Sequence, residues 1–234
     1  MKKIALVISV EHAVNTIPAA YQSLFSGHES VLNTHRGVDF GAKALGEHLA
    51  ACLPCDYQEA TASRLLIDCN RSLNHPKCFS EWTQPLTQDE KDIIIHHYYL
   101  PFREPIEQCI ERHIKNNRQV FHLSVHSFTP ELNGITRNAA IGLLYDPTRH
   151  AEKEIARIWH TILTHTPPDY NIRMNYPYRG ASDGFVSALR KKYSEQVYVG
   201  FELENNQTLV QEASSFEMLK DIHAKSLIKL IEMI

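Results

Sequence analysis

KIALVISV, residues 3–10, is a nearly continuous apolar run rich in β-branched side chains. Such a run is typical of a central strand in a sheet that is covered on both faces. It leads into Glu11 and His12 rather than into a small-residue cleavage site, so it predicts the first strand of a domain and not a secretion signal. Polar groups that follow such a strand are expected at the edge where α/β proteins build their sites.

Further apolar runs alternate with helical patterns along the chain. Strands are predicted over residues 119–125 (QVFHLSV), 139–145 (AAIGLLY) and 196–203 (QVYVGFEL). Helices are predicted over residues 42–52, 87–116, 148 to about 164, 185–193 and 216–234. This alternation predicts an α/β fold, with residues 1–234 forming a single three-layer domain around a central mixed, largely parallel sheet flanked by helices.

The long helical segment from residue 87 has clear local signals. Thr87 is a suitable N-cap, and Glu90 three residues later completes a capping box. Pro101 and Pro105 lie inside the segment and are expected to kink it.

Composition excludes several classes of function. Hydrophobic residues make up 43% of the 234 residues and charged residues 22%, which are ordinary values for a globular protein with a proper core. A net charge of −3 gives no reason to expect a nucleic-acid partner, and no apolar run approaches the roughly 20 residues of a membrane span. The five cysteines are an odd number, and the Cys52–Cys55 pair stands alone, so reduced thiols and a cytoplasmic location are expected.

The segment SRLLIDCNRS, residues 63–72, combines an apolar centre with a dense polar cluster. Residues 65–67 predict a short buried strand, flanked by arginines that need acidic or polar partners. One interpretation is an anion clamp in which Asn70 and Arg71 hold a substrate carboxylate, with Arg64 beside them. The other is a structural ion pair between Asp68 and one of these arginines that ties the strand end to its loop.

Three predicted strands end in groups with catalytic chemistry: His12, His126 and Glu202. Two neutral imidazoles, a carboxylate and an open position for water make up a catalytic zinc site, and a free glutamate beside it can act as the general base. One histidine at a strand end is more often structural, and the chain has 14. Most of the others, including His223, are expected to be solvated, whereas His35 could support the site from its polar loop.

Six short segments, in order, resemble one enzyme family. They are VEHAVNTIP (10–18), GVDFGAKAL (37–45), SRLLIDCNRS (63–72), HLSVHSFTP (122–130), YRGASDG (178–184) and FELENN (201–206). Together they look like the N-formylglutamate amidohydrolase family, and they are more distantly similar to the zinc carboxypeptidases and aspartoacylases. The resemblance covers residues 4 to about 206 and implies a phosphorylase/hydrolase-like, zinc-carboxypeptidase-like fold.

The resemblance also assigns roles to residues near the metal. It implies that His12 and His126 bind Zn²⁺ or another divalent metal and that Glu202 is the general base. Glu204 lies on the same face of an extended strand and is the alternative base.

The metal-binding motif departs from the pattern of the wider superfamily. There a His-Xaa-Xaa-Glu motif supplies a histidine and a carboxylate, but the fourth position here is Asn15, whose amide oxygen is a poor zinc ligand. Asp39 is the first candidate for the missing carboxylate. Glu11 is the second, because adjacent strand residues point to opposite faces and His12 already occupies the site face.

Substrate binding follows from the same resemblance. Arg64 and the 68–71 segment match the substrate-binding positions of the aspartoacylase-like relatives, with Asn70 and Arg71 for the α-carboxylate and Arg64 for the oxyanion. Arg179 resembles a further substrate-binding position and would suit a dicarboxylate, although it could instead pair with Asp183. Ser127 has no nucleophile-elbow glycines around it, so a serine hydrolase is not favoured.

These expectations converge on a metal-dependent hydrolase of non-peptide amide bonds. Its partner would be a small N-acyl amino acid, with N-formyl-L-glutamate as the first candidate, and the sequence does not indicate an oligomeric state. A degenerate, non-catalytic carboxylate-binding homologue is the alternative that Asn15 favours. A zinc peptidase acting on small or cell-wall peptides is the second alternative.

Overall fold

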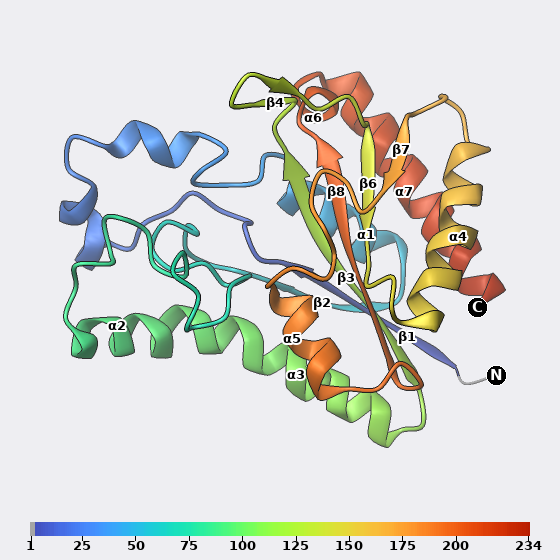
Figure 1. The fold of residues 1–234 in the computed structure, drawn as a ribbon, viewed down its shortest axis with the longest axis horizontal. Coiled ribbons are helices and arrows are strands. Elements are labelled where there is room, and N and C mark those ends of the chain that lie inside the picture. Colours follow the sequence, from blue (N-terminus) through green and yellow to red (C-terminus); the bar gives the residue numbers. More distant parts are fainter. Residues whose placement is uncertain (1–2) are drawn as a thin grey trace.

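The apolar run at the start of the chain forms β1 (Ile4–Val10), the second strand of a six-stranded sheet with the order β2-β1-β3-β8-β6-β7 (Figure 1). The protein is described by a computed structural model over residues 3–234, so the first two residues of the expected domain lie outside the described part. The other strands of this sheet are β2 (Cys55–Glu59), β3 (Gln119–Phe128), β6 (Ile141–Leu144), β7 (Ile172–Met174) and β8 (Tyr198–Asn206).

Strand directions confirm the mixed, largely parallel sheet. Neighbouring strands are parallel except for β6 and β8, which are antiparallel. A small antiparallel hairpin, β4 (Glu131–Leu132) and β5 (Ile135–Thr136), separates β3 from β6. Because β1, β3 and β8 are adjacent and parallel, their carboxyl ends meet at one edge.

Helices cover both faces of the sheet, as Figure 1 shows. One face packs against α1 (Ala42–Cys52), α4 (His150–Thr164) and α7 (Ala213–Met233). The other packs against α3 (Leu100–Lys115) and α5 (Phe185–Lys192), together with irregular chain from residues 60–79. The remaining helical elements are η1 (Ala19–Phe25), η2 (Glu29–Asn33), α2 (Gln88–Ile94), the π-helical η3 (Ile95–Tyr99) and α6 (Thr208–Gln211).

The two faces of the sheet differ in polarity, and this difference places the site. Along β1, Leu6, Ile8 and Val10 all join the core under α1, α4 and α7. The alternate side chains face α3 and α5, where the apolar Val7 is followed by the buried, polar Ser9. On β3 and β8 the same face carries further buried polar groups. The face of the sheet toward α3 and α5 therefore changes from apolar near the start of these strands to polar near their carboxyl ends.

The predicted strand at residues 65–67 is wrong. This stretch is a series of turns in which the Leu66 amide donates to the Ser63 carbonyl and the Arg71 amide to the Asp68 carbonyl. Its apolar side chains are buried against the second face of the sheet. An apolar run of three residues is too short to show strand periodicity, so tertiary packing decides its backbone conformation.

The long helical segment confirms the predicted capping box, and both of its prolines lie within α3. Thr87 and Glu90 cap each other's backbone at the start of α2. The π-helical η3 ends two residues before Pro101, whose ring would clash with the carbonyl of His97 in regular α-helix. The wider turn accommodates the proline, and α3 continues through Pro105.

Candidate active site

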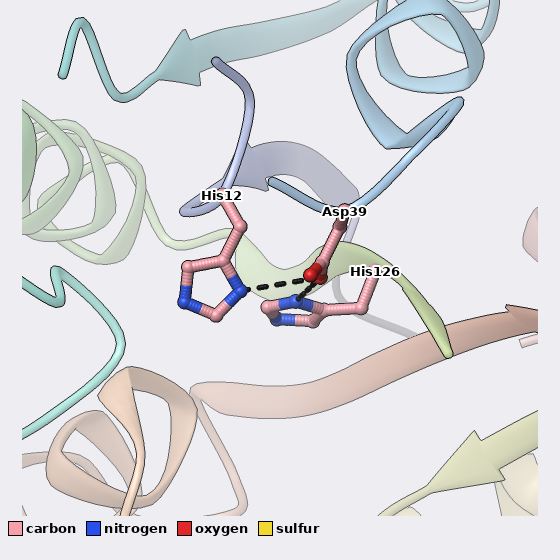
Figure 2. A group of neighbouring side chains, drawn as sticks. All are labelled: His12, Asp39 and His126. Atoms are coloured by element: carbon pink, nitrogen blue, oxygen red, sulfur yellow. Dashed lines mark hydrogen bonds and ion pairs between the residues drawn. The ribbon is translucent and has the colours of Figure 1, made fainter. Parts of the chain in front are cut away.

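His12, Asp39 and His126 meet in one buried cluster (Figure 2). Asp39 Oδ2 lies 3.1 Å from Nδ1 of His12 and 2.9 Å from Nδ1 of His126. The two imidazole rings are tilted, with their centroids 5.0 Å apart. Potential ligand atoms of the three residues all lie within 4.8 Å of one another, close enough for one cation to contact all of them.

The fold brings these residues together from distant parts of the chain. His12 lies two residues beyond the end of β1, and His126 lies within β3, the neighbouring parallel strand. Asp39 is in the loop before α1, where its amide donates to the carbonyl of His12 over 3.1 Å. The backbone therefore fixes the Asp39 loop against the end of β1.

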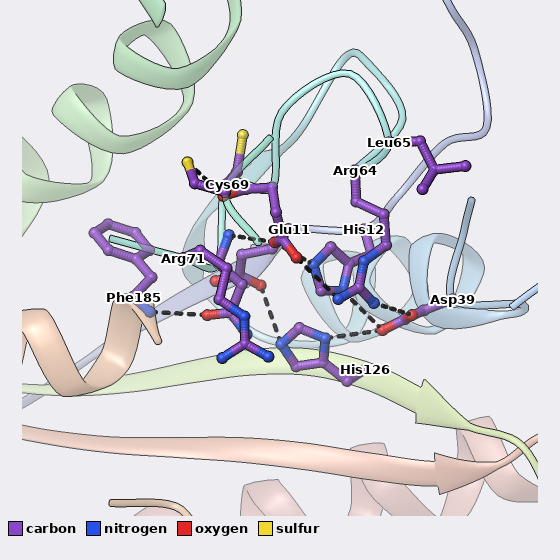
Figure 3. Close-up of polar contacts among 12 residues, drawn as sticks. Glu11, His12, Asp39, Arg64, Leu65, Cys69, Arg71, His126 and Phe185 are labelled. Atoms are coloured by element: carbon purple, nitrogen blue, oxygen red, sulfur yellow. Dashed lines mark hydrogen bonds and ion pairs between the residues drawn. The ribbon is translucent and has the colours of Figure 1, made fainter. Parts of the chain in front are cut away.

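A second aspartate and an arginine support the cluster. Asp68 Oδ1 lies 2.8 Å from Nε2 of His12, the ring nitrogen that faces away from Asp39. Arg64 donates to Asp68 Oδ2 over 2.9 Å and to Asp39 Oδ1 over 3.4 Å (Figure 3). The ion pair between Arg64 and Asp68 that the sequence suggested is thus present, and it forms part of the site.

Charges in the cluster stabilise one another. Burial opposes ionisation of Asp39, but His12 and His126 hold the pKa of its carboxyl well below the usual range. Burial likewise opposes protonation of His126, but Asp39 and Glu11 raise its pKa to about 10. Asp68 has a depressed pKa because Arg64 and His12 outweigh its burial. In the metal-free protein the cluster is therefore a buried set of paired charges.

Glu202 and Glu204 lie on the same face of β8, within its strand rather than at its end. Burial raises the pKa of both carboxyls, that of Glu204 to about 8. In the sheet Glu204 is in register with His126, whereas Glu202 is in register with Ser124. Glu202 also lies beside Gly184, at the start of α5, where a Cβ would be 3.2 Å from its Oε1.

A cavity of about 860 Å³ opens over these groups, and every catalytic, metal-binding and substrate-binding residue expected from the sequence lines it. Asn70 Oδ1 accepts the amide hydrogen of Phe185 over 2.8 Å. Arg71 donates to the carbonyl of Asp183 over 2.6 Å. Arg179 is exposed, and within residues 3–234 it forms no ion pair with Asp183 or another acid.

Other candidate residues lie outside the cluster. Glu11 is buried on the far side of His126, with its Oε2 3.5 Å from Nε2. Asn15 donates to Asn33 in an exposed position. Ser127 is buried and accepts from Gln207, and His35 lines the cavity.

Local sequence patterns do not reveal three further features. The prediction that His223 is solvated is wrong. This residue is fully buried, and its Nε2 lies 2.7 Å from Asn205 Oδ1. Asp68 was recognised as an arginine partner but not as a partner of His12. Asp56, Cys109 and His113 form a second group of possible ligands at β2 and α3, where the guanidinium of Arg112 lies 2.6 Å from Asp56. All depend on contacts between residues far apart in the chain.

No helix within residues 3–234 combines the length and apolar character that crossing a membrane requires. All five cysteines are free thiols.

The fold is similar to that of a gene product of Agrobacterium tumefaciens, with a TM-score of 0.83 and 24% identity over 99% of this chain and 91% of that chain. It is also similar to N-formylglutamate amidohydrolase from Ralstonia eutropha JMP134, with a TM-score of 0.73 and 19% identity over 100% of this chain and 95% of that one. No curated protein matches the chain significantly. Residues 4–210 match the sequence model of N-formylglutamate amidohydrolase. The chain therefore belongs to the N-formylglutamate amidohydrolase family, hydrolases that act on carbon–nitrogen bonds other than peptide bonds.

Proposed function

We propose that the protein is a zinc-dependent amidohydrolase that cleaves the amide bond of a small N-acyl amino acid, with N-formyl-L-glutamate as its first candidate substrate. The observation that carries this proposal is the buried His12, Asp39 and His126 cluster in the wall of a cavity that also holds two buried glutamates and several arginines. Family membership supports the reaction class. The family is named after N-formylglutamate, which supports the choice of substrate.

The donor set fits zinc. Two imidazoles and one carboxylate leave a position open for water, as in catalytic zinc sites. Ligand bonds of about 2.0–2.2 Å in tetrahedral geometry put neighbouring ligand atoms roughly 3.4 Å apart. Asp39 Oδ2 is 3.1 and 2.9 Å from the two Nδ1 atoms, so small side-chain movements suffice. Zinc at this position would polarise the amide carbonyl and lower the pKa of a bound water.

The glutamates of β8 supply proton transfer. Glu202 takes a proton from the attacking water and passes it to the leaving amine. Burial raises the pKa of Glu202 above that of an exposed carboxyl, which makes it a stronger base toward the attacking water. Glu204, two residues further on the same face, is the alternative base.

Arginines and an asparagine bind the substrate. Asn70 and Arg71 take the α-carboxylate. Their positions are fixed by hydrogen bonds to Phe185, the first residue of α5, and to Asp183, two residues before it. Arg64 stabilises the oxyanion, and Arg179 binds the side-chain carboxylate of the substrate. Arg64 is held by Asp39 and Asp68 beside the proposed metal position, which fits this role.

The experiment that tests the proposal combines elemental analysis with an assay of formate release. The purified protein should bind one zinc ion per chain and hydrolyse N-formyl-L-glutamate, and His126→Ala should lose both properties because one ligand is gone. His150→Ala, which changes an exposed histidine at the start of α4, is the matched control and should retain both.

Short peptides are tested as alternative substrates in the same assay. Stoichiometric zinc with hydrolysis of peptides but not of N-formyl-L-glutamate would replace the proposed substrate by a peptide. Carboxylate binding without zinc and without hydrolysis would overturn the enzymatic proposal in favour of a binding protein.

A further inference from the structure

A buried chain of hydrogen bonds leads away from His126 on the side opposite Asp39. Nε2 of His126 lies 2.8 Å from Ser124 Oγ, and that hydroxyl donates to Glu11 Oε2 over 2.6 Å. Each of these three residues is at most 3% exposed. In Figure 3 the two ring nitrogens of His126 point in opposite directions, one of them toward Asp39.

The chain continues beyond Glu11 along the same face of the sheet. Ser9 donates to Glu11 Oε1 over 2.8 Å, and Ser9 Oγ lies 2.8 Å from Nε2 of His122. Nδ1 of His122 is in turn 2.8 Å from the hydroxyl of Tyr198. Glu11 is therefore the common acceptor of two serine hydroxyls, each of which also contacts one histidine.

Counting hydrogens fixes the direction of every bond. Both serine hydroxyl hydrogens point at Glu11, whose two carboxyl oxygens accept them. Each serine has one such hydrogen, so Ser124 Oγ can only accept from His126. His126 Nε2 must then carry a hydrogen, so Nδ1, which faces Asp39, is the ring nitrogen that can give up its hydrogen and bind a metal.

We infer that Glu11 is a positioning residue of the metal site, which acts through Ser124 to hold the ring hydrogen of His126 on Nε2 and so present Nδ1 to the metal. This inference rests on the proposed metal-dependent function. Asp68 does the same for His12 directly, since its Oδ1 lies 2.8 Å from Nε2. In both histidines, the ring nitrogen that does not face the metal position is therefore held by a carboxylate, directly or through a serine, as is common for metal-ligating histidines. Glu11 is the second candidate ligand from the sequence. In this arrangement it does not bind the metal but orients the ligand His126 through Ser124.

Two matched serine substitutions test the inference. Ser124→Ala and Ser9→Ala each remove one hydroxyl that donates to Glu11, but only the first cuts the link to His126. In zinc competition with a chelator, Ser124→Ala should bind zinc about 10–100-fold more weakly than wild type, the usual loss for an outer partner of a ligand. Ser9→Ala should bind it as wild type does. Equal affinity of the two variants would overturn the inference, whereas absence of zinc binding by the wild-type protein would instead overturn the proposed function.

A second measurement reads the hydrogen positions directly. Burial lowers the pKa of His122 to about 4, so its ring is neutral near pH 7 and has one defined hydrogen. Nitrogen-15 NMR of the metal-free wild-type protein should find it on Nε2, because Ser9 can only accept. A hydrogen on Nδ1 of His122 would overturn the proposed order of bonds, whether or not metal binds.

The variant Glu11→Gln probes the acceptor itself. An amide has one accepting and one donating end, so it must reverse the bond to one of the two serines. Reversal at Ser124 weakens zinc binding, and reversal at Ser9 moves the hydrogen of His122 to Nδ1. A folded Glu11→Gln protein with neither change would show that the carboxylate does not set the order.

Discussion

Asp39 contacts both histidines of the site and the supporting arginine, so the geometry of the centre depends on this one side chain. Asp39 is 5% exposed, and its charge is balanced by His12, His126 and Arg64. Such a group is costly to bury alone and stable only with all its partners. A metal ion at the same place would replace hydrogen bonds between carboxylate and imidazoles by bonds to a shared cation.

The two glutamates of β8 can be separated by their effect on turnover. Glu202→Gln preserves size but cannot accept a proton, so kcat of the zinc-loaded enzyme should fall by about 10²–10⁴-fold with little change in KM. Glu204→Gln is the matched control and should reduce kcat less. Steady-state kinetics with N-formyl-L-glutamate provides the measurement. The reverse ranking would assign the general base to Glu204, and unchanged turnover in Glu202→Gln would remove that residue from the mechanism.

At the scale of elements, buried polar contacts fix how helices pack against the sheet. Glu152, fully buried at the start of α4, lies 3.0 Å from Nε of Arg190 on α5 and accepts the Gly200 amide of β8 over 3.1 Å. Arg190 in turn donates to the Gly180 and Gly200 carbonyls. These bonds fix α5, whose first residues adjoin Asn70 and Glu202, relative to the sheet.

The contact between α7 and β8 predicts a specific pH dependence. Burial lowers the pKa of His223 to about 3, whereas an unfolded histidine titrates near 6.5. Between these values the unfolded chain binds a proton that the folded protein does not, so the unfolding free energy should fall as pH decreases, by at most about 1.4 kcal/mol per unit. His223→Gln can still donate to Asn205 but does not titrate. Denaturant unfolding of the metal-free protein at pH 4–7 should show a shallower slope for it than for wild type.

A matched control completes this measurement. His150→Gln changes an exposed histidine at the start of α4 and should leave the acid slope of the wild type unaltered. A slope in His223→Gln equal to that of wild type would mean that His223 does not contribute to acid destabilisation.

At the scale of the whole molecule, the proposed zinc site joins the end of β1, the loop before α1 and the middle of the sheet. Zinc that binds only the folded state stabilises it by about 2.7 kcal/mol at a free concentration 100 times Kd. For a chain of this size, that corresponds to a rise in Tm of roughly 5–10 °C. Thermal unfolding with zinc and with excess chelator should show this difference. In His126→Ala the difference should disappear, and a wild-type Tm that does not respond to zinc would contradict the proposal.

Much of the architecture follows from local patterns in the sequence. The β-branched runs at residues 4–10, 119–125 and 196–203 indicated central strands because a strand buried on both faces needs apolar side chains at successive positions. The capping box of Thr87 and Glu90 marked the start of α2 because both partners lie within one turn. The order of the short motifs also indicated the family, which the match over residues 4–210 confirmed.

What the sequence alone determined is therefore which chemical groups are available and which local segments become strands and helices. Tertiary structure decided which groups meet: it placed Asp39 rather than Asn15 or Glu11 between the histidines, and it gave residues 65–67 a turn conformation. Secondary-structure signals arise from neighbours within a few residues, so local patterns can reveal them. The contacts of Asp39, Asp68 and Glu11 join residues 27 to 113 positions apart, and only the packing of the whole sheet and its covering layers sets those distances.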